Sequence, residues 1–564
     1  ESLDAAIREA REMRRLGRIG QNDTLFITLA DGVHRIVEPL MLRPENSGTP
    51  QSPTIIRAEH RGAATISGGM ALTGWRRATR DELRGVPERI HQQIWVADAP
   101  RVNGRIVETR QLWMGDRRLP QASLVPQDSL LPLADFNKES REITIPARYA
   151  TSLSRNSSFQ PWMLVHQRWA IALLRIKEVV MADTLAKITF LEPESRREFE
   201  HPWPQPVIRD TLDDGRIVSS SFNLMGNVSL LDKAGEWVQS YPDGLIYYVS
   251  EDRGGAAPSA EITIPVTSQL MRVEGTLERP VRDILFDGIR FEHTAWTTPN
   301  REGWVTLQAG FPIVDAYKLA EPGLPEKTTL ENQAWIGRPE SAIAVRGAER
   351  VVFGQCEFAH TGACAVDFVE ACGQCAVTES RFGDIGASAI IIGHFPAGGF
   401  ETHVPFRPLL ANDLCHDIAI GHNQIQNVGM EDWGASAINA GYVRDVTIAD
   451  NVVAGCKWSG ICVGWGWTRL DSGMRNNHIV RNHVKDFGLQ LHDCGAIYTL
   501  SNQPRSSIVG NRLEGMGRAP FATNNRAFYI YLDEATDGFT IRDNVMPEWR
   551  IGQNQPGKNL IIDK

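Results

Sequence analysis

The sequence predicts an all-β protein: a right-handed parallel β-helix with an inserted antiparallel β domain of sandwich-like type. A short apolar pattern recurs through the second half of the chain. The pattern disappears in a long middle region, where strand-like runs alternate with turn residues. The length of 564 residues also exceeds what one ordinary hydrophobic core organises, so an elongated or divided architecture is expected.

The recurring unit is an apolar residue, two variable residues, a small or polar residue, one variable residue and a second apolar residue. One such unit cannot bury its apolar face alone, but stacked coils bury a continuous core. Asn suits the recurring corner because it tolerates left-handed backbone and because stacked amides can hydrogen-bond to one another. The alternative is a set of unrelated sandwich strands with Asn turns. The last five copies carry Asn423, Asn451, Asn482, Asn511 and Asn544 at the middle position.

Three segments are expected along the chain. Residues 1–75 should start the β-helix, with an amphipathic helix at 3–16 capping its first coil. Residues 76–275 lack the repeat, and runs such as "QQIWVADAP" and "DGLIYYVSED" predict the inserted antiparallel domain. Residues 276–564 should form the main β-helix and carry the active site.

Composition excludes some classes of partner. The formal net charge of −9 argues against a nucleic-acid partner, because phosphate binding needs clustered Lys and Arg. No apolar run approaches the roughly 20 residues of a membrane-spanning helix. The eight Cys lie between Cys356 and Cys494 without paired zinc-ribbon spacing, so most are expected to be buried core residues. No cofactor or metal is expected.

Two carboxylates accompany two late strand-like runs, "LHDCGAIYTL" with Asp493 and "AFYIYLDEATDG" with Asp533. Side chains on neighbouring coils, whose strands lie about 4.8 Å apart, can approach within about 5–10 Å. That range includes the paired carboxylates of glycoside hydrolysis. The spacing therefore permits a catalytic pair. We take Asp493 as the charged partner and Asp533 as the acid, although the sequence does not decide which of the two is the acid.

The register of the two runs makes this pairing conditional. Asp493 precedes its strand whereas Asp533 ends the next one, so straight strands would hold them apart. A bend or bulge near Gly495 is required, and glycine permits one. Other carboxylates remain alternatives: Glu431, Asp432, Asp471 and Glu534.

Aromatic side chains gather in the same coils as the two aspartates. Trp465 and Trp467 are two residues apart, which predicts that they share one face of a strand. Aromatic faces beside carboxylates suit sugar rings. The alternatives are that one Trp belongs to the core and that His492 is a satisfied structural residue. The predicted substrate-binding residues are Trp465, Trp467, His492, Tyr498, Tyr531 and Glu431.

The order of "SGICVGWGW", "HDCGAIYTL", "YIYLDE" and "FTIRDNVM" resembles the β-helix glycoside hydrolases of family 141. The upstream "QLWMGDRRLPQA" and "LLDKAGEWVQSYPDGLIYY" are similar to the inserted domain of that family. The resemblance implies an exo-acting α-L-fucosidase of pectin breakdown, or a xylan-acting enzyme, with catalytic aspartates at Asp493 and Asp533. This chain departs from the family at Cys494, where members commonly carry Gly.

Two other function classes remain open beside the glycoside hydrolase. A polysaccharide lyase on the same fold needs a strong base, for which Arg469 and Arg526 are candidates. A non-catalytic glycan-binding β-helix needs no catalytic pair. A polymeric substrate and the unusual first residue Glu1 lead us to expect a periplasmic or extracellular protein whose signal peptide has been removed. The sugar, the linkage, retention or inversion and the oligomeric state stay open.

Overall fold

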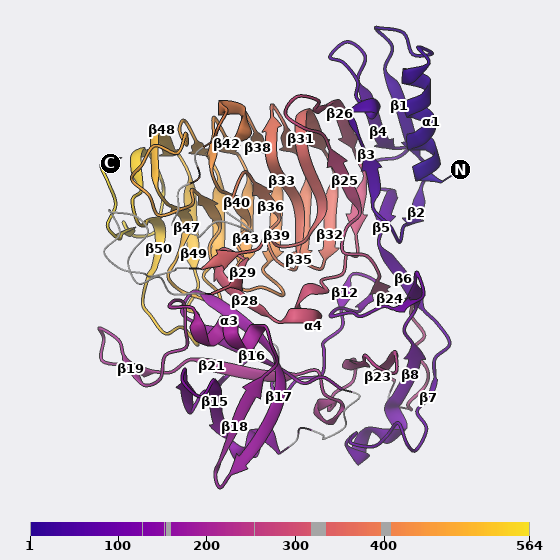
Figure 1. Cartoon of the computed structure of the whole chain (residues 1–564), viewed down its shortest axis with the longest axis vertical. Coiled ribbons are helices and arrows are strands. Elements are labelled where there is room, and N and C mark those ends of the chain that lie inside the picture. The colour runs from indigo at the N-terminus through magenta and orange to yellow at the C-terminus, as the bar shows by residue number, and fades with distance from the viewer. Residues whose placement is uncertain are drawn as a thin grey trace.

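The computed structural model describes residues 2–562 except residues 127, 152, 154–158, 253, 317–333, 396–405 and 407. It is a right-handed parallel β-helix with a β-rich insertion, which confirms the predicted fold class. In Figure 1 the coils stack from the N-terminal strands in indigo to the C-terminal strands in yellow. The insertion, in purple and magenta, lies below this stack.

The coils supply three rows of parallel strands. The first row is β1 (Leu25–Leu29), β4 (Thr54–Ala58), β26 (Val281–Asp287), β31 (Ser341–Gly354), β34 (Ala376–Thr378), β38 (Ala419–Gly421), β42 (Thr447–Ala449), β45 (His478–Val480), β48 (Asn502–Val509), β51 (Asp537–Arg542) and β53 (Leu560–Ile561). The second row is β2 (Gly32–Arg35), β5 (Ala64–Ser67), β27 (Arg290–Glu292), β32 (Glu357–Thr361), β35 (Arg381–Ile385), β39 (Gln424–Val428), β43 (Val452–Cys456), β46 (His483–Phe487) and β49 (Arg512–Met516). The third row is β3 (Leu40–Leu42), β25 (Met271–Glu274), the first part of β31, β33 (Cys364–Gly373), β36 (Ile390–Ile392), β40 (Ile438–Ala440), β44 (Ile461–Val463), β47 (Cys494–Thr499), β50 (Ala527–Leu532) and β52 (Ile551–Gln553), with β37 (Cys415–His416) and β41 (Val443–Arg444) extending it.

Apolar side chains stack inside the coils in register. Phe286 aligns with Phe353 on the next coil, and their rings stack with centroids 4.7 Å apart. Phe358 and Phe382 stack in the same way in the second row of strands, with ring centroids also 4.7 Å apart. These separations match the spacing between parallel strands, so identical residue types in successive coils pack without strain.

The predicted asparagine ladder is present. Nδ2 of Asn451 donates to Oδ1 of Asn482 at 2.9 Å, and Nδ2 of Asn482 donates to Oδ1 of Asn511 at 3.0 Å. Asn itself does not take the left-handed turn. The preceding residue does so, as Asp450 (φ 58°) and Arg481 (φ 52°) show. The amide is therefore free to point inward, where it satisfies buried backbone groups.

Helix α1 (Leu3–Arg15) packs on the first coil. Its residues Leu3, Ile7 and Ala10 are buried, and Nη2 of Arg14 donates to the backbone oxygen of Ser52 at 2.8 Å. Covering an open end protects strand edges that would otherwise pair with other chains.

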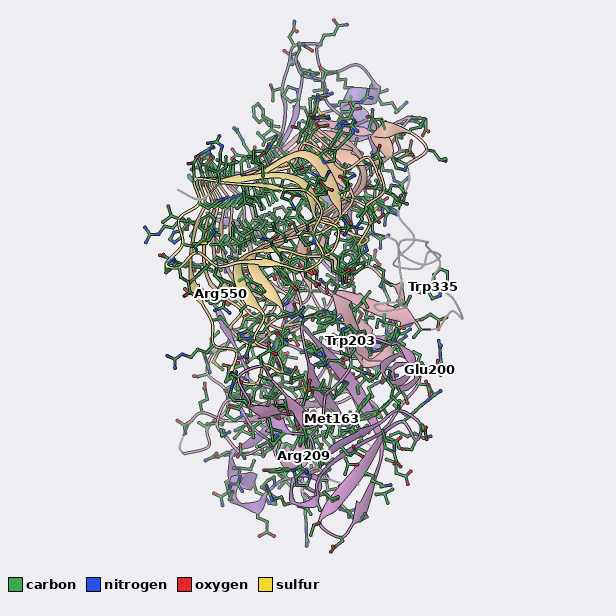
Figure 2. All side chains as sticks on the ribbon, turned by 90° about the vertical axis from the view of Figure 1, so that its left-hand side faces the viewer. Met163, Glu200, Trp203, Arg209, Trp335 and Arg550 are labelled. Carbon is green, nitrogen blue, oxygen red and sulfur yellow. The ribbon has the colours of Figure 1, made fainter. Side chains whose placement is uncertain are left out.

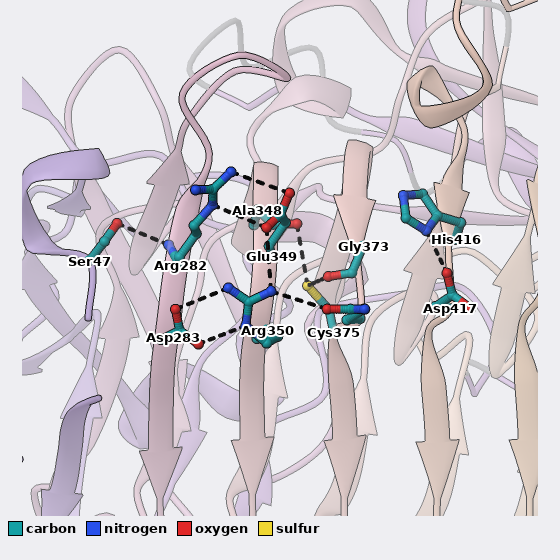
Figure 3. Close-up of polar contacts among 11 residues, drawn as sticks. Ser47, Arg282, Asp283, Ala348, Glu349, Arg350, Gly373, Cys375, His416 and Asp417 are labelled. Atoms are coloured by element: carbon teal, nitrogen blue, oxygen red, sulfur yellow. Dashed lines mark hydrogen bonds and ion pairs between the residues drawn. The ribbon is translucent and has the colours of Figure 1, made fainter. Parts of the chain in front are cut away.

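Salt bridges link neighbouring coils along one edge of the stack (Figure 3). Nε of Arg350 donates to Asp283 at 2.7 Å, and Arg282 pairs with Glu349 at 3.0 Å. Cys375 lies beside them with its thiol directed to the backbone oxygen of Gly373 at 3.4 Å. All eight cysteines are buried and free, as expected for small core residues.

The insertion consists of antiparallel strands and short helices. Its largest sheet contains β13 (Leu131–Pro132), β14 (Asp135–Asn137), β15 (Glu142–Pro146), β16 (Trp162–Gln167), β17 (Ala170–Ala182), β18 (Leu185–Phe190) and β21 (Ser221–Met225). Two smaller sheets contain β6 (Gly69–Leu72), β11 (Trp113–Met114), β12 (Arg117–Arg118) and β24 (Ile262–Pro265), and β7 (Arg76–Arg77), β8 (Ile94–Asp98), β22 (Trp237–Ser240) and β23 (Leu245–Val249). Further elements of the insertion are the ribbons β9 (Arg101–Val102) with β10 (Arg105–Ile106) and β19 (Asp210–Thr211) with β20 (Ile217–Val218), and the helices α2 (Ala147–Ala150) and α3 (Glu194–Glu200). Helix α4 (Thr298–Glu302) follows β27 later in the chain.

Strands from later in the chain join this sheet. β28 (Trp304–Gln308) pairs with β17, and it is followed by β29 (Phe311–Asp315) and β30 (Trp335–Ile336). The antiparallel layer therefore recruits residues beyond 275, and the division into three segments stays a prediction.

Candidate active site

A pocket with a cavity volume of about 310 Å³ lies where the last coils meet the insertion. Figure 2 labels Trp203, one of its wall residues, at this junction. The pocket is lined by Arg168, Trp169, Trp203, Gln308, Trp467, Asp493, Tyr498, Asn524, Arg526, Tyr531, Asp533, Glu534, Asn554 and Gln555. The two predicted aspartates thus share one pocket, together with Trp467, Tyr498 and Tyr531.

The backbone bends where the sequence required it. Asp493 adopts left-handed backbone (φ 56°) immediately before β47. A Cβ atom added to Gly495 would lie 2.6 Å from the backbone oxygen of Ile497 and 3.1 Å from Cβ of Tyr531. Only glycine fits this close approach. The turn itself is the left-handed backbone of Asp493, two residues before Gly495, and Asp493 lines the same pocket as Asp533.

Asp533 is buried, with 8% of its surface exposed, and it follows the end of β50. Its Oδ1 accepts from Nδ2 of Asn554 at 2.7 Å, and its Oδ2 accepts from the hydroxyl of Tyr498. Burial, reinforced by the charge of Asp493, raises the pKa of Asp533 to about 7. A carboxyl group in this position holds a proton near neutral pH.

Asp493 has more cationic surroundings. Burial raises the pKa of this carboxyl group, but Arg526, the Tyr531 hydroxyl and Arg168 all act to lower it. Asp493 in turn is the main cause that raises the pKa of Arg526. Asp493 is therefore better supported as an anion than Asp533, which has no guanidinium among its main influences.

The insertion supplies one wall of the pocket. Arg168 and Trp169 form the turn between β16 and β17, and the Arg168 guanidinium lies 4.2 Å from the ring centroid of Trp203. Nε1 of Trp169 donates to the backbone oxygen of Leu307 at 2.8 Å, which ties this turn to β28. From the same strand, Nε2 of Gln308 donates to the Tyr498 hydroxyl at 3.0 Å.

Sequence reasoning missed this wall entirely. Its residues lie more than 150 positions before the aspartates, in a region without the repeat, and single Trp and Arg residues there carry no distinguishing pattern. Asn524, Asn554 and Gln555 were missed for a related reason, because they belong to loops between coils.

The prediction that Trp465 and Trp467 share a strand face is wrong. β44 ends at Val463, and Gly464 (φ 108°) and Gly466 (φ 94°) turn the chain away from extended backbone. Trp467 lines the pocket, whereas Trp465 belongs to the core. Trp465 packs against Phe311 and Phe395, with ring centroids 5.2 and 5.0 Å away.

His492 and Glu431 do not line the pocket either. The ring of His492 lies between two backbone oxygens, with Nδ1 3.0 Å from that of Asn524 and Nε2 3.4 Å from that of Gly517. It therefore fixes the loop that precedes β50. Glu431 is buried against Arg118, with the Arg110 guanidinium 3.8 Å away, so it joins the insertion to the coils.

The other alternative carboxylates have separate positions. Asp432 is fully buried and accepts from Nε1 of Trp304 at 2.8 Å and from Thr306 at 3.1 Å. Asp471 is exposed and accepts from the backbone of Gly473 at 2.9 Å, as in a turn. Among the alternatives, Glu534 lines the pocket beside Asp533.

No helix in the described part of the chain is long and apolar enough to span a membrane.

Comparisons with known proteins identify the family. A family model of the GH141 insertion domain matches residues 92–251. A solved structure described as a glycoside hydrolase is 33% identical, with a TM-score of 0.91, over 99% of this chain and 92% of its own. The complex of XylC with xylose aligns over 94% of this chain and 65% of its own, with 12% identity and a TM-score of 0.45. A search of curated proteins found no match. The insertion model and the full-length likeness together show that this chain belongs to glycoside hydrolase family 141.

Proposed function

We propose that Asp493 and Asp533 are the catalytic carboxylates of this glycoside hydrolase, with Asp533 as the general acid. The observation that carries the proposal is the pair of carboxyl groups in one pocket with unlike surroundings, with Asp533 buried and Asp493 half-buried. Asp533 has a pKa of about 7, whereas Asp493 lies beside Arg526. Glycoside hydrolysis needs this division between a protonated and an ionised carboxyl group.

The proposed reaction begins with proton transfer. Asp533 donates its proton to the glycosidic oxygen, the bond from that oxygen to the anomeric carbon breaks, and the leaving alcohol departs neutral. Asp493, as an anion, either attacks the anomeric carbon or takes a proton from the water that attacks it. In both versions Asp533 ends ionised after the first step, and the hydroxyl of Tyr498 and the amide of Asn554 stabilise its anion.

We propose an exo-acting α-L-fucosidase that removes a terminal sugar from pectic or related plant oligosaccharides. The sugar assignment is supported by the family resemblance alone. The exo mode is supported by the pocket, which the insertion closes on one side with Trp169 and Trp203. Action outside the cytoplasm is part of the same proposal, because the substrate is a fragment of a polymer.

Lyase chemistry has less support at this site. Arg526 is a candidate base that lies in the pocket, but its pKa is raised, first by the charge of Asp493. A guanidinium held more firmly in its charged form cannot accept a proton from a sugar carbon.

A screen of the purified protein against aryl glycosides, including α-L-fucoside and β-xyloside, together with pectic oligosaccharides, tests the proposal. Release of fucose that is lost in Asp493→Asn and in Asp533→Asn supports the class, the sugar and the site. Cleavage of the xyloside instead keeps the site but replaces the sugar. An unsaturated product that absorbs ultraviolet light identifies a lyase, and full activity in both variants overturns the assignment of the aspartates.

A further inference from the structure

A second cluster of polar side chains lies on β27 and β32, in the coils that follow the insertion along the chain. Glu292 ends β27, His293 follows it, and His360 lies on β32 in the next coil. β27 and β32 pair in parallel with Glu292 opposite Ala359, so the two histidines occupy equivalent positions in successive coils. Their ring centroids are 5.1 Å apart. One possible ligand atom from each of the three residues lies within 4.8 Å of the other two.

These side chains are buried but incompletely hydrogen-bonded. The exposed fractions are 8% for Glu292, 7% for His293 and 3% for His360. Nε2 of His293 and Nδ1 of His360 have no hydrogen-bond partner among the described residues. An unpaired buried polar group costs about 1–3 kcal/mol. Two such nitrogens beside one carboxylate provide three potential ligand atoms for a cation.

Neighbouring residues orient both rings for binding. Nδ1 of His293 lies 3.1 Å from Oγ of Ser67, which also accepts from the backbone N–H of Gly69 at 3.1 Å. A proton on Nδ1 therefore donates to Ser67 and leaves the lone pair on Nε2 free. The ring of Trp113 stacks on His360 with centroids 4.1 Å apart, which holds the plane of that imidazole.

The charges facing the cluster favour a cation. Arg290 donates to Glu292 and to Asp116, both at 2.8 Å, and lies 3.6 Å from Glu357. Asp116 also lies 3.7 Å from Nε2 of His360. Three carboxylates therefore surround one guanidinium, so negative charges outnumber the positive charge of Arg290 beside the cluster.

An adjoining cavity gives access. It has a volume of about 330 Å³ and shares no lining residue with the active-site pocket. Its walls include Glu292 and His293 from the coils and Gly115, Asp116 and Thr263 from the insertion. An ion at the cluster would therefore lie at the junction between the two parts of the fold.

We propose that Glu292, His293 and His360 bind one late first-row divalent cation, with Zn²⁺ as the best match. Two imidazoles and one carboxylate are typical ligands for Zn²⁺, and a fourth position remains for water from the cavity. Ligand atoms that lie about 2.0–2.2 Å from a tetrahedral ion are roughly 3.4 Å from one another. The ligand atoms of the three side chains, which now lie within 4.8 Å of one another, must therefore move about 1 Å closer together when the ion binds. The bound ion holds the insertion against the coils of β27 and β32 through Trp113 and Asp116.

Zinc titration of chelator-treated, dialysed full-length protein tests this proposal. We expect one Zn²⁺ per chain by calorimetry and by elemental analysis, with a dissociation constant below about 1 µM. Affinity should fall more than about 100-fold in His360→Gln, because losing a residue that merely orients a ligand already costs about 10–100-fold. Glu292→Gln preserves the side-chain size and serves as a second variant if His360→Gln does not fold.

The chain offers a matched control. Asp31, Glu59 and His60 form an exposed group with similar spacing, so His60→Gln should bind Zn²⁺ like the unmodified protein. Loss of binding in His60→Gln would place the ion there and overturn the proposal. A dissociation constant weaker than about 1 mM in the unmodified protein, or unchanged binding in a folded Glu292→Gln, would overturn it as well. None of these readouts depends on hydrolase activity.

Discussion

The hydroxyl of Tyr498 donates a hydrogen bond to Oδ2 of Asp533 and accepts one from Nε2 of Gln308 at 3.0 Å. Residues of three elements are thereby joined: β47, the end of β50 and β28 next to the insertion. The hydrogen bond from Tyr498 lowers the pKa of Asp533, whereas burial and Asp493 raise it. The acidity of the proposed catalytic acid thus depends on a contact between the coils and the insertion-side sheet.

Tyr498→Phe should move the alkaline limb of the pH–rate profile to higher pH. In the unmodified enzyme kcat/KM should fall above about pH 7, where Asp533 loses its proton. Removing a hydrogen bond to the anion raises the pKa of Asp533 further, so the acid stays protonated at higher pH. Tyr529→Phe is a suitable control, because Tyr529 lies on β50, the strand that Asp533 follows, and does not line the pocket. An unchanged limb in Tyr498→Phe would contradict this relationship.

Asp533→Asn and Asp493→Asn should differ in their dependence on the leaving group. Both should lose at least about 10³-fold in kcat/KM on ordinary glycosides. A substrate with a very acidic leaving group, such as a dinitrophenyl glycoside, needs no protonation, so it should restore much of the rate in Asp533→Asn only. Steady-state kinetics on matched substrates measure this. Asp471→Asn, at an exposed turn, should behave like the unmodified enzyme. If the dinitrophenyl glycoside restored the rate of Asp493→Asn instead, Asp493 would be the acid and Asp533 the charged partner.

Asp533→Asn should also change how stability depends on pH. The pKa of Asp533 is raised from 3.8 to about 7 in the folded protein, so folding favours the protonated form. The stabilisation is present below about pH 4 and is lost as the pH rises through 7. The loss is on the order of 4 kcal/mol, about 3 °C in melting temperature for a chain of 564 residues.

Calorimetric melting of both proteins at pH 4.5 and pH 8 measures this effect. The difference between variant and unmodified protein matters, since it cancels the titration of other groups. The variant should gain relative stability at the higher pH. A difference that does not vary with pH would show that Asp533 keeps an ordinary pKa.

The sequence predicted the coils and the aspartate pair for the same physical reason. Because the coils stack, the same residue types recur in the sequence about once per coil, as Asn451 and Asn482 do. Residues at equivalent positions of adjacent coils must therefore lie close together. The sequence also predicted a bend near Gly495, because Asp493 precedes its strand and Asp533 ends the next one. The pocket wall had no such signal, because Arg168 and Trp203 reach the site only through the tertiary arrangement of an aperiodic insertion. The prediction that Trp465 faces the substrate was wrong, because Gly464 and Gly466 turn the chain where the two-residue spacing of Trp465 and Trp467 had indicated a strand.

Trp203→Ala should raise KM by about tenfold and change kcat little. Trp203 is half-buried in the pocket wall, and an aromatic face contributes to binding the sugar in the ground state and the transition state alike. Trp549→Ala, at a residue that is 43% exposed and outside the pocket lining, is the matched control. Michaelis–Menten kinetics on the preferred glycoside provide the measurement. A fall in kcat at constant KM would show that Trp203 stabilises the transition state and does not contribute to binding the sugar in the ground state.

Asn482→Ala should destabilise the β-helix by about 2–4 kcal/mol while leaving the pocket residues in place. Oδ1 of Asn482 accepts from the backbone N–H of Asn451 at 3.1 Å and from its side chain at 2.9 Å. Its Nδ2 donates to the backbone oxygen of Ile448 at 2.9 Å. Alanine leaves these buried partners unpaired in the middle of the stack, where water cannot replace the amide.

Asn412→Ala removes an exposed amide that accepts one hydrogen bond from Arg444, so it should cost less than about 0.5 kcal/mol. Chemical denaturation of both variants compares the two costs, and equal midpoints would show that the ladder contributes nothing specific to the stability of the coils.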